Sequence, residues 1–197
     1  MKNSAIILGT LLISLCSFSQ NTPSLADFEK EIQAAGLTFE MPESYSITEV
    51  KENPDLQYSF AIQNAEHTIE VRYSIFPLDE MMKKYEASLK DSTVTMAHPN
   101  KLFKGIVRAN ALNMNGGQPY DIAAFPAVAV KEEFNADNGG SCFFDVNCAF
   151  GEGYTYGQFI YLHRDNVADV IITYLSNDKA THSDLMLESF HALRFEK

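Results

Sequence analysis

Two adjacent segments alternate apolar and polar residues, and this alternation limits what the chain can fold into more than any other feature. The segments are QYSFAIQ, residues 57–63, and HTIEVRYSIF, residues 67–76. A period of two places every second side chain on the same side of a β-strand. The side that is predicted to be buried carries Tyr58, Phe60, Ile62, His67, Ile69, Val71, Tyr73 and Ile75. The pattern predicts an antiparallel hairpin that turns at residues 64–66 and has one water-facing side, on which Arg72 lies.

Four further strands are predicted in the second half of the chain, at about residues 127–134, 141–150, 155–164 and 169–175. Short turns separate them: DNGG at residues 137–140, GEG at residues 151–153 and DN at residues 165–166. Such short turns join antiparallel neighbours, because a parallel connection needs about a dozen residues or more. A brief strand, LTFEM at residues 37–41, precedes Pro42.

Helices are predicted in blocks around these strands. Residues 24–35 begin with the capping residues Ser24 and Asp27, and the last helix covers about residues 183–193. Two more begin at Pro77 and Pro99, and the second of these ends at the Asn-Gly-Gly of residues 115–117. The helix from Pro77 has an apolar stripe that favours packing against the sheet over a groove for a partner: Leu78, Met81, Met82, Tyr85 and Leu89.

This order of elements is typical of an α+β protein. We expect an antiparallel β-sheet of about six to seven strands flanked by helices. The chain has no internal repeat and no linker rich in Pro, Gly or Ser, so residues 20–197 are predicted to form a single domain.

The first residues, MKNSAIILGTLLISLCSFSQ, predict export from the cytoplasm. A basic residue, Lys2, precedes an apolar run, and small residues flank Phe18, as in a secretory signal peptide cleaved after Ser19. A lipoprotein signal acylated at Cys16 is disfavoured, because Leu15 stands where a small residue is expected. The apolar run is too short to span a bilayer, so residues 1–19 are a predicted signal peptide and the mature chain has no predicted transmembrane segment. The predicted location is the periplasm or the exterior of the cell.

The charge of the mature chain argues against nucleic acid and anionic membranes as partners. The whole chain has 15 basic and 26 acidic residues. Loss of Lys2 with the signal peptide leaves 14 − 26 = −12. A field of this sign repels phosphate groups.

Cys142 and Cys148 lie in SCFFDVNCAF, residues 141–150, where the even positions are all apolar. A straight strand places the two Cα atoms about 20 Å apart, whereas a disulfide needs about 4.4 to 6.8 Å. We therefore expect a strand with two buried, reduced thiols. The alternative is a tight loop at residues 145–147 closed by a disulfide, which export to an oxidising compartment would favour.

No sequence motif for catalysis or cofactor binding is present. No cofactor and no metal are predicted, because the five histidines lack the spacing of a zinc site. A small secreted hydrolase is an alternative that would need a histidine such as His163 close to a serine and a carboxylate. Residues 135–139, which contain Asp137, resemble only the start of a calcium loop, so a plain turn is preferred over a calcium- or small-ligand-binding module.

The segment GEGYTYGQFIYLH, residues 151–163, is the most plausible recognition surface. Tyr154 and Tyr156 are predicted to share one strand face, and Gly157 indicates a bulge. Aromatic side chains at a strand end can grip a peptide, a glycan or a protein, although capping of the core is the more common role. We expect these tyrosines and the turn at Asp137 and Asn138 to form a contact patch.

Three features resemble the PsbP-like fold, which includes DcrB-type envelope lipoproteins. They are the opening GLTFEMPESYSI at residues 36–47, the hairpin at residues 57–75 that leads into a helix at Pro77, and the closing helix with Glu188-Ser189-Phe190 and an extended tail at residues 193–196. The chain departs from the group where Ser44-Tyr45 replaces a glycine and a tryptophan. The resemblance implies an antiparallel sheet between helices and a noncatalytic accessory role. The signal sequence ending Ser-Phe-Ser-Gln also resembles those of Bacteroidetes.

These observations together predict an exported noncatalytic accessory or binding module of the cell envelope. Its partner is expected to be an envelope protein or a small ligand.

Overall fold

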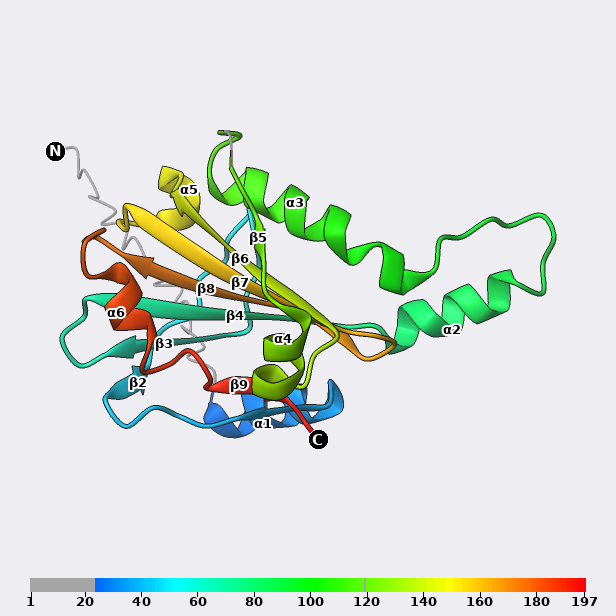
Figure 1. Cartoon of the computed structure of the whole chain (residues 1–197), viewed down its shortest axis with the longest axis horizontal. Helices are drawn as coiled ribbons and strands as arrows, with labels where there is room; N and C mark the ends of the chain where they lie inside the picture. The colour runs from blue at the N-terminus through cyan, green and yellow to red at the C-terminus, as the bar shows by residue number, and fades with distance from the viewer. Residues whose placement is uncertain (1–23, 119) are drawn as a thin grey trace, which may run out of the picture.

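The fold is built on a seven-stranded antiparallel β-sheet (Figure 1). The computed structural model describes residues 24–118 and 120–197, so the predicted signal peptide and Cys16 lie outside the described residues. The strand order is β2-β3-β4-β8-β7-β6-β5. The strands are β2 (Tyr45–Ile47), β3 (Phe60–Asn64), β4 (Ile69–Pro77), β5 (Ala123–Ala124), β6 (Asn138–Asp145), β7 (Tyr156–Arg164) and β8 (Ala168–Ser176). The predicted α+β class with an antiparallel sheet and flanking helices is confirmed.

The predicted hairpin is present as β3 and β4, which pair with Phe60 opposite Tyr73. The side chain of Asn64 closes its turn, because its Oδ1 accepts from the backbone N–H groups of Thr68 (2.9 Å) and Ile69 (3.2 Å). His67 lies in this turn with φ of 55° and is exposed. The prediction that His67 lies on the apolar strand face is therefore wrong, because the turn takes up one residue more than the alternation indicated.

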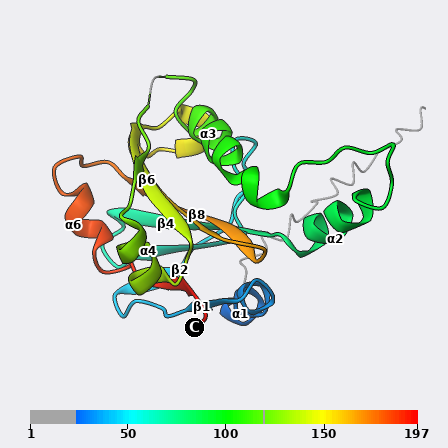
Figure 2. The same ribbon diagram turned by 45° about the vertical axis from the view of Figure 1, so that its right-hand side comes forward.

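Helices and loops cover both faces of the sheet (Figure 2), and a separate hydrophobic core lies on each face. One face packs against α1 (Leu25–Ala34), α4 (Ala127–Phe134), α6 (His182–Met186) and a two-stranded sheet of β1 (Leu37–Phe39) and β9 (Leu193–Phe195). The other face packs against α3 (Phe103–Met114), which follows the 3-10 turn η1 (Pro99–Lys101). The prediction of a water-facing side on the hairpin is wrong, since Ala61, Arg72 and Ser74 are all buried.

The first helix begins and ends as predicted. The Ser24 hydroxyl accepts from the Asp27 N–H (3.1 Å) and donates to the Asp27 carboxylate (2.7 Å). Phe28 is buried and stacks on Phe60 of β3 with ring centroids 4.2 Å apart. Gly36, with φ of 65°, ends the helix.

The segment at residues 127–134 is the helix α4, and its prediction as a strand is wrong. Val130 and Phe134 are buried one helical turn apart, whereas Val128 is 68% exposed. A strand would place Val128 and Val130 on the same face. Pro126 precedes the helix and Asn135 ends it in the left-handed region, so its boundaries have the usual chemistry.

The helix from Pro77 forms as α2 (Asp79–Ser88), but it does not pack into the core. None of its residues is buried, and Figure 1 shows it projecting away from the sheet. Leu78, just before the helix, is the one member of the predicted stripe that is buried, and Leu89 is 69% exposed. The expected packing on the sheet is therefore wrong for α2, because α3 occupies that face.

The predicted strand at residues 141–150 ends early. The strand β6 stops at Asp145, and Cys148 begins the short helix α5 (Cys148–Gly151). Asn147 causes the change, because its Oδ1 accepts from the Phe150 N–H (2.8 Å) and starts the turn. Cys142 is a free, buried thiol as expected, but the prediction of both cysteines on one straight strand is wrong.

The C-terminal helix α6 ends at Met186, earlier than predicted, and the tail forms β9 as expected. Within residues 24–118 and 120–197, no helix has the length and apolar character to cross a bilayer.

Candidate functional site

The residues of the predicted contact patch lie at opposite ends of the sheet. Asn138 pairs with His163 at one end of the β6–β7 ladder, and Asp145 pairs with Tyr156 at the other. The seven residue steps from Tyr156 to His163 correspond to about 23 Å. Asp137 and Asn138 therefore belong to one part of the surface, and Tyr154 and Tyr156 belong to another.

Tyr154 and Tyr156 contact different residues. Tyr154 precedes β7, and its hydroxyl accepts from Gln63 Nε2 (2.7 Å) and donates to a Glu70 carboxylate oxygen (3.4 Å). Burial raises the pKa of Tyr154 to about 12. Tyr156 stacks near Phe143 on the strand surface, with ring centroids 6.1 Å apart.

The predicted bulge at Gly157 is absent, because Phe144 and Gly157 pair in regular register. A Cβ atom at Gly157 would lie 2.8 Å from Val146 and 2.9 Å from the Phe144 ring. The glycine therefore makes room for these neighbours in place of bending the strand.

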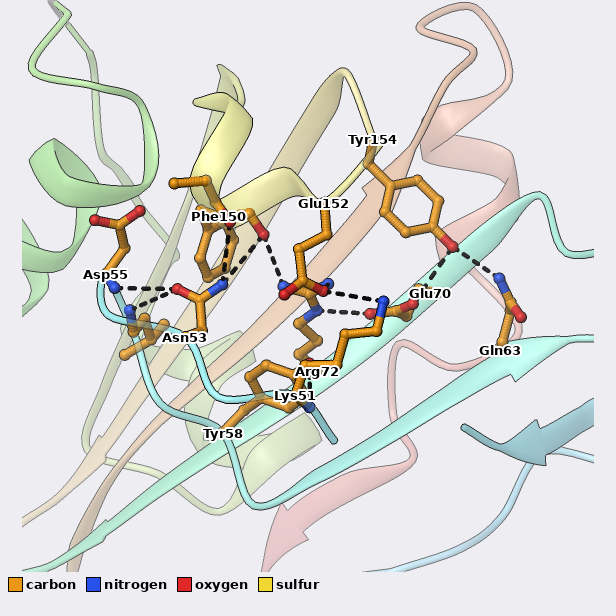
Figure 3. Close-up of polar contacts among 12 residues, drawn as sticks. Lys51, Asn53, Asp55, Tyr58, Gln63, Glu70, Arg72, Phe150, Glu152 and Tyr154 are labelled. Carbon is orange, nitrogen blue, oxygen red and sulfur yellow. Dashed lines mark hydrogen bonds and ion pairs between the residues drawn. The ribbon is translucent and has the colours of Figure 1, made fainter. Parts of the chain in front are cut away.

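The Tyr154 end of the sheet contains a buried ionic network that the sequence did not reveal. Arg72 of β4 is only 2% exposed, and Figure 3 shows its guanidinium among carboxylates and aromatic rings. Its Nε donates to Glu70 (2.6 Å), its Nη1 donates to the Phe150 carbonyl (2.8 Å) and its Nη2 donates to Glu152 (3.1 Å). Lys51 lies 3.4 Å from the same Glu152 carboxylate. The guanidinium also lies over the ring of Tyr58, 4.7 Å from its centroid.

This network attaches two loops to the sheet. Residues 148–154 are held through Phe150 and Glu152. Residues 51–58 are held through Lys51, whose Nζ lies 3.4 Å from Glu152, and through Asn53, whose Nδ2 donates to the Phe150 carbonyl (3.5 Å). Each of the three guanidinium nitrogens of Arg72 donates a hydrogen bond to a protein oxygen. The arrangement is suited to fastening loops, because one buried guanidinium contacts residues from both of them.

His163 holds the opposite end of the sheet in a similar way. Its Nδ1 and Nε2 lie 2.5 Å from Asp169 and 2.9 Å from Asp165, and its ring stacks on Phe103 at 4.1 Å. Burial acts to lower the pKa of His163, but hydrogen bonds and charge interactions with the two carboxylates outweigh it and leave the pKa raised. The Asp165 N–H in turn donates to Asp137 (2.9 Å). Both ring nitrogens therefore have carboxylate partners, and no serine contacts them in the described chain.

A serine–histidine pair does occur elsewhere, but it is enclosed. Ser176 Oγ lies 2.7 Å from His182 Nδ1, and both residues are fully buried. Burial lowers the pKa of His182. No substrate can reach this pair without opening the fold. Among the described residues, no group of three or more His, Cys, Asp or Glu side chains is arranged to hold a metal ion.

The structure places Asp137 and Asn138 on the lining of a cleft that residues of α3, α4 and the start of β6 form. The cleft has a volume of about 260 Å³. Gly139 and Gly140 form part of its floor, where larger residues would not fit. A Cβ atom at Gly140 would lie 2.5 Å from the Ala123 carbonyl and 2.7 Å from the Tyr161 ring. The Asp-Asn-Gly-Gly segment, predicted as a turn, therefore lets β5 and Tyr161 approach β6 closely.

Apolar and polar side chains both line the cleft. Val107 of α3 and Val130 of α4 line it but are nearly fully buried, and Ile122 and Phe125 beside β5 are half-buried. The charged lining residues are Lys104, Arg108 and Asp137. Asp137 already has a partner, because a carboxylate oxygen lies 3.6 Å from Lys131 Nζ. An apolar cavity with a few polar groups is the usual form of a small-molecule site.

Lys104 and Arg108 were missed at the sequence level, although a signal was present. The helix FKGIVRANALNM carries two basic residues four apart and no acidic residue, within a strongly acidic chain. This spacing puts both on one helix face.

No protein-family model matches the chain, and no curated protein matches it. The geometry of the cleft and of the two buried networks is therefore the basis for assigning a function.

Proposed function

We propose that the protein is an exported, noncatalytic binding module of the cell envelope that takes a small ligand into the cleft between α3 and α4. The observation that carries the proposal is the cleft itself, where apolar side chains such as Ile122 and Phe125 lie beside the cationic side chains of Lys104 and Arg108. It is formed by residues of α3, α4, the segment around β5 and the start of β6.

A binding role is favoured over hydrolysis by the way the histidines are used. His163 is engaged by two carboxylates, and His182 is enclosed with Ser176. A general base must reach the proton that it removes, and neither histidine lies on the cleft wall. A calcium-binding role for Asp137 has less support, because its oxygens face Lys131 and the Asp165 N–H.

Export and a PsbP-like membership are part of the proposal. They are supported by the signal-peptide pattern at residues 1–19 and by the order of strand, hairpin and closing helix. Mass spectrometry of the protein recovered after export from a Gram-negative host tests the first. We expect an N-terminus at Gln20, and a retained N-terminal segment or acylated Cys16 would contradict it.

The cleft itself is tested by binding of an uncharged apolar fluorophore, N-phenyl-1-naphthylamine. We expect saturable fluorescence from one site on the wild-type protein. Ala127→Phe, which fills the cleft from α4, should weaken binding at least about tenfold, because no volume is left for the ring. Val128→Phe is the matched control on the same helix, since Val128 is exposed and does not line the cleft. Equal binding by wild type and Ala127→Phe would contradict the proposal.

A further inference from the structure

We infer that the ligand of the α3–α4 cleft is a small amphiphilic anion, with a carboxylate or phosphate head and a short apolar tail. The inference rests on the proposed function, because it assigns a chemical class to the ligand of the same cleft. Its starting point is the cationic pair Lys104 and Arg108 at the cleft edge.

The pair lacks carboxylate partners within the described structure, although Lys104 Nζ lies 5.7 Å from the centroid of the Phe103 ring. Lys104 and Arg108 are exposed, and none of the ion pairs among the described residues involves either. Like charges four residues apart on a helix repel each other. Lys104 also lies in the first turn of α3, where the helix dipole disfavours a cation. A bound anion would offset both effects.

The cation pair contrasts with the rest of the chain. The formal net charge is −11, yet the charged residues that line the cleft are two cations and one carboxylate. That carboxylate, Asp137, is near Lys131 at 3.6 Å. The local field at the cleft edge is therefore opposite in sign to the net charge, and it favours an anion that the remaining surface would repel.

The apolar lining specifies the other half of the ligand. Val107, one turn from Lys104 on α3, and Val130 of α4 line the cleft but are only 5% and 1% exposed. The apolar surface that a ligand can contact comes from Ile122 and Phe125, which are half-buried, and from Ala124 and Ala127, which are exposed. A head group held by the two cations would place its tail between α3 and α4.

The volume limits the size of the ligand. About 260 Å³ is slightly below the range of about 300–1,000 Å³ that is usual for small-molecule pockets. A chain of about eight carbon atoms with its head group fits this space. The inference therefore concerns a small molecule with a short tail.

The test compares octyl compounds that differ only in their heads. Isothermal titration calorimetry would be carried out with octanoate, octyl phosphate, 1-octanol and octylammonium at low ionic strength. We expect octanoate and octyl phosphate to bind about tenfold or more tightly than 1-octanol, and octylammonium to bind most weakly, because hydrogen bonds to charged groups add to the apolar contact. Preference for one anion over the other identifies the head group.

Charge reversal supplies the control. Lys104→Glu with Arg108→Glu should abolish the preference for anions and improve octylammonium binding. Lys84→Glu with Lys90→Glu makes the same change in net charge on exposed residues that do not line the cleft, and it should leave the preference within about twofold.

The outcomes separate the two claims. If 1-octanol binds as tightly as octanoate, and reversal of Lys104 and Arg108 changes neither, the anion inference is overturned while the cleft remains a binding site. If neither the octyl compounds nor N-phenyl-1-naphthylamine bind, the proposed function fails and the inference fails with it.

Discussion

The buried guanidinium of Arg72 gives the sharpest prediction of stability. Arg72→Ala would leave the carboxylates of Glu70 and Glu152 and the Phe150 carbonyl without their donors. Removing one member of a buried ion pair costs about 3–5 kcal/mol. Glu70 and Glu152 are 12% and 21% exposed and can recover some hydration, so we expect a loss of about 3 kcal/mol in the free energy of unfolding. For a domain of this size that lowers Tm by about 6–12 °C.

Urea unfolding followed by circular dichroism measures this effect, and two variants calibrate it. Arg72→Lys keeps the charge but loses the planar fork, so a loss of about 1–2 kcal/mol is expected. Arg194→Ala removes an exposed arginine 3.8 Å from Glu40 and should cost less than about 0.5 kcal/mol. A cost for Arg72→Ala no larger than that for Arg194→Ala would refute the view that this network fastens the loops.

Three further predictions concern other parts of the fold. The pKa of His163 in the folded protein is raised above its unfolded value of about 6.5. The charged imidazole therefore stabilises the fold fully when the pH is below about 6.5. This stabilisation is lost as the pH rises through the folded pKa. The stability difference between wild type and His163→Gln, from urea unfolding, should shrink between pH 6 and pH 9, and a difference that grows would contradict the assignment. Gly140→Ala should lower the free energy of unfolding by about 1–3 kcal/mol, because its Cβ would clash with the Ala123 carbonyl. Gly105→Ala should raise it by about 0.5–1 kcal/mol, because a Cβ there meets open space on α3. Thermal melts of both variants measure the difference, and equal shifts of Tm would refute the packing argument. Burial raises the pKa of the Cys142 thiol to about 11. In a Cys148→Ala variant, Cys142 should therefore react with a thiol reagent at pH 8 only after the protein is denatured. Rapid labelling of the folded protein would contradict this prediction.

The sequence predicted the sheet well because its central strands have regular patterns. Both ends of β7 and β8 were placed within about one residue, and the hairpin was found from alternation alone. The capping pair Ser24 and Asp27 fixed the start of α1. Short-range sequence patterns specify such elements, so these patterns are sufficient to predict them.

The errors arose where long-range contacts decide the structure. The valines near residue 130 suggested a strand, but only the packing of Val130 and Phe134 shows that they lie on one helix face. Arg72 occupied a polar position in an alternating strand, and only the loops at residues 51–58 and 148–154 make that position buried. The methionines of α2 gave no sign that α3 would cover the sheet in their place.

The candidate site was predicted only in part. Asp137 and Asn138 do lie at the cleft, but the tyrosines assigned to the same patch lie at the other end of β7. The cleft is formed by α3, α4 and the start of β6, which are separated in sequence. No local pattern could have brought Lys104 close to Val130.

The most direct test of the account is an amide chemical-shift titration of the ¹⁵N-labelled protein with octanoate. We predict saturable shifts concentrated at the cleft, at residues such as Val107, Arg108, Val130 and Gly139. Shifts concentrated instead at Tyr154 and Tyr156, or no saturable shifts at all, would contradict the claim that the cleft between α3 and α4 is the binding site.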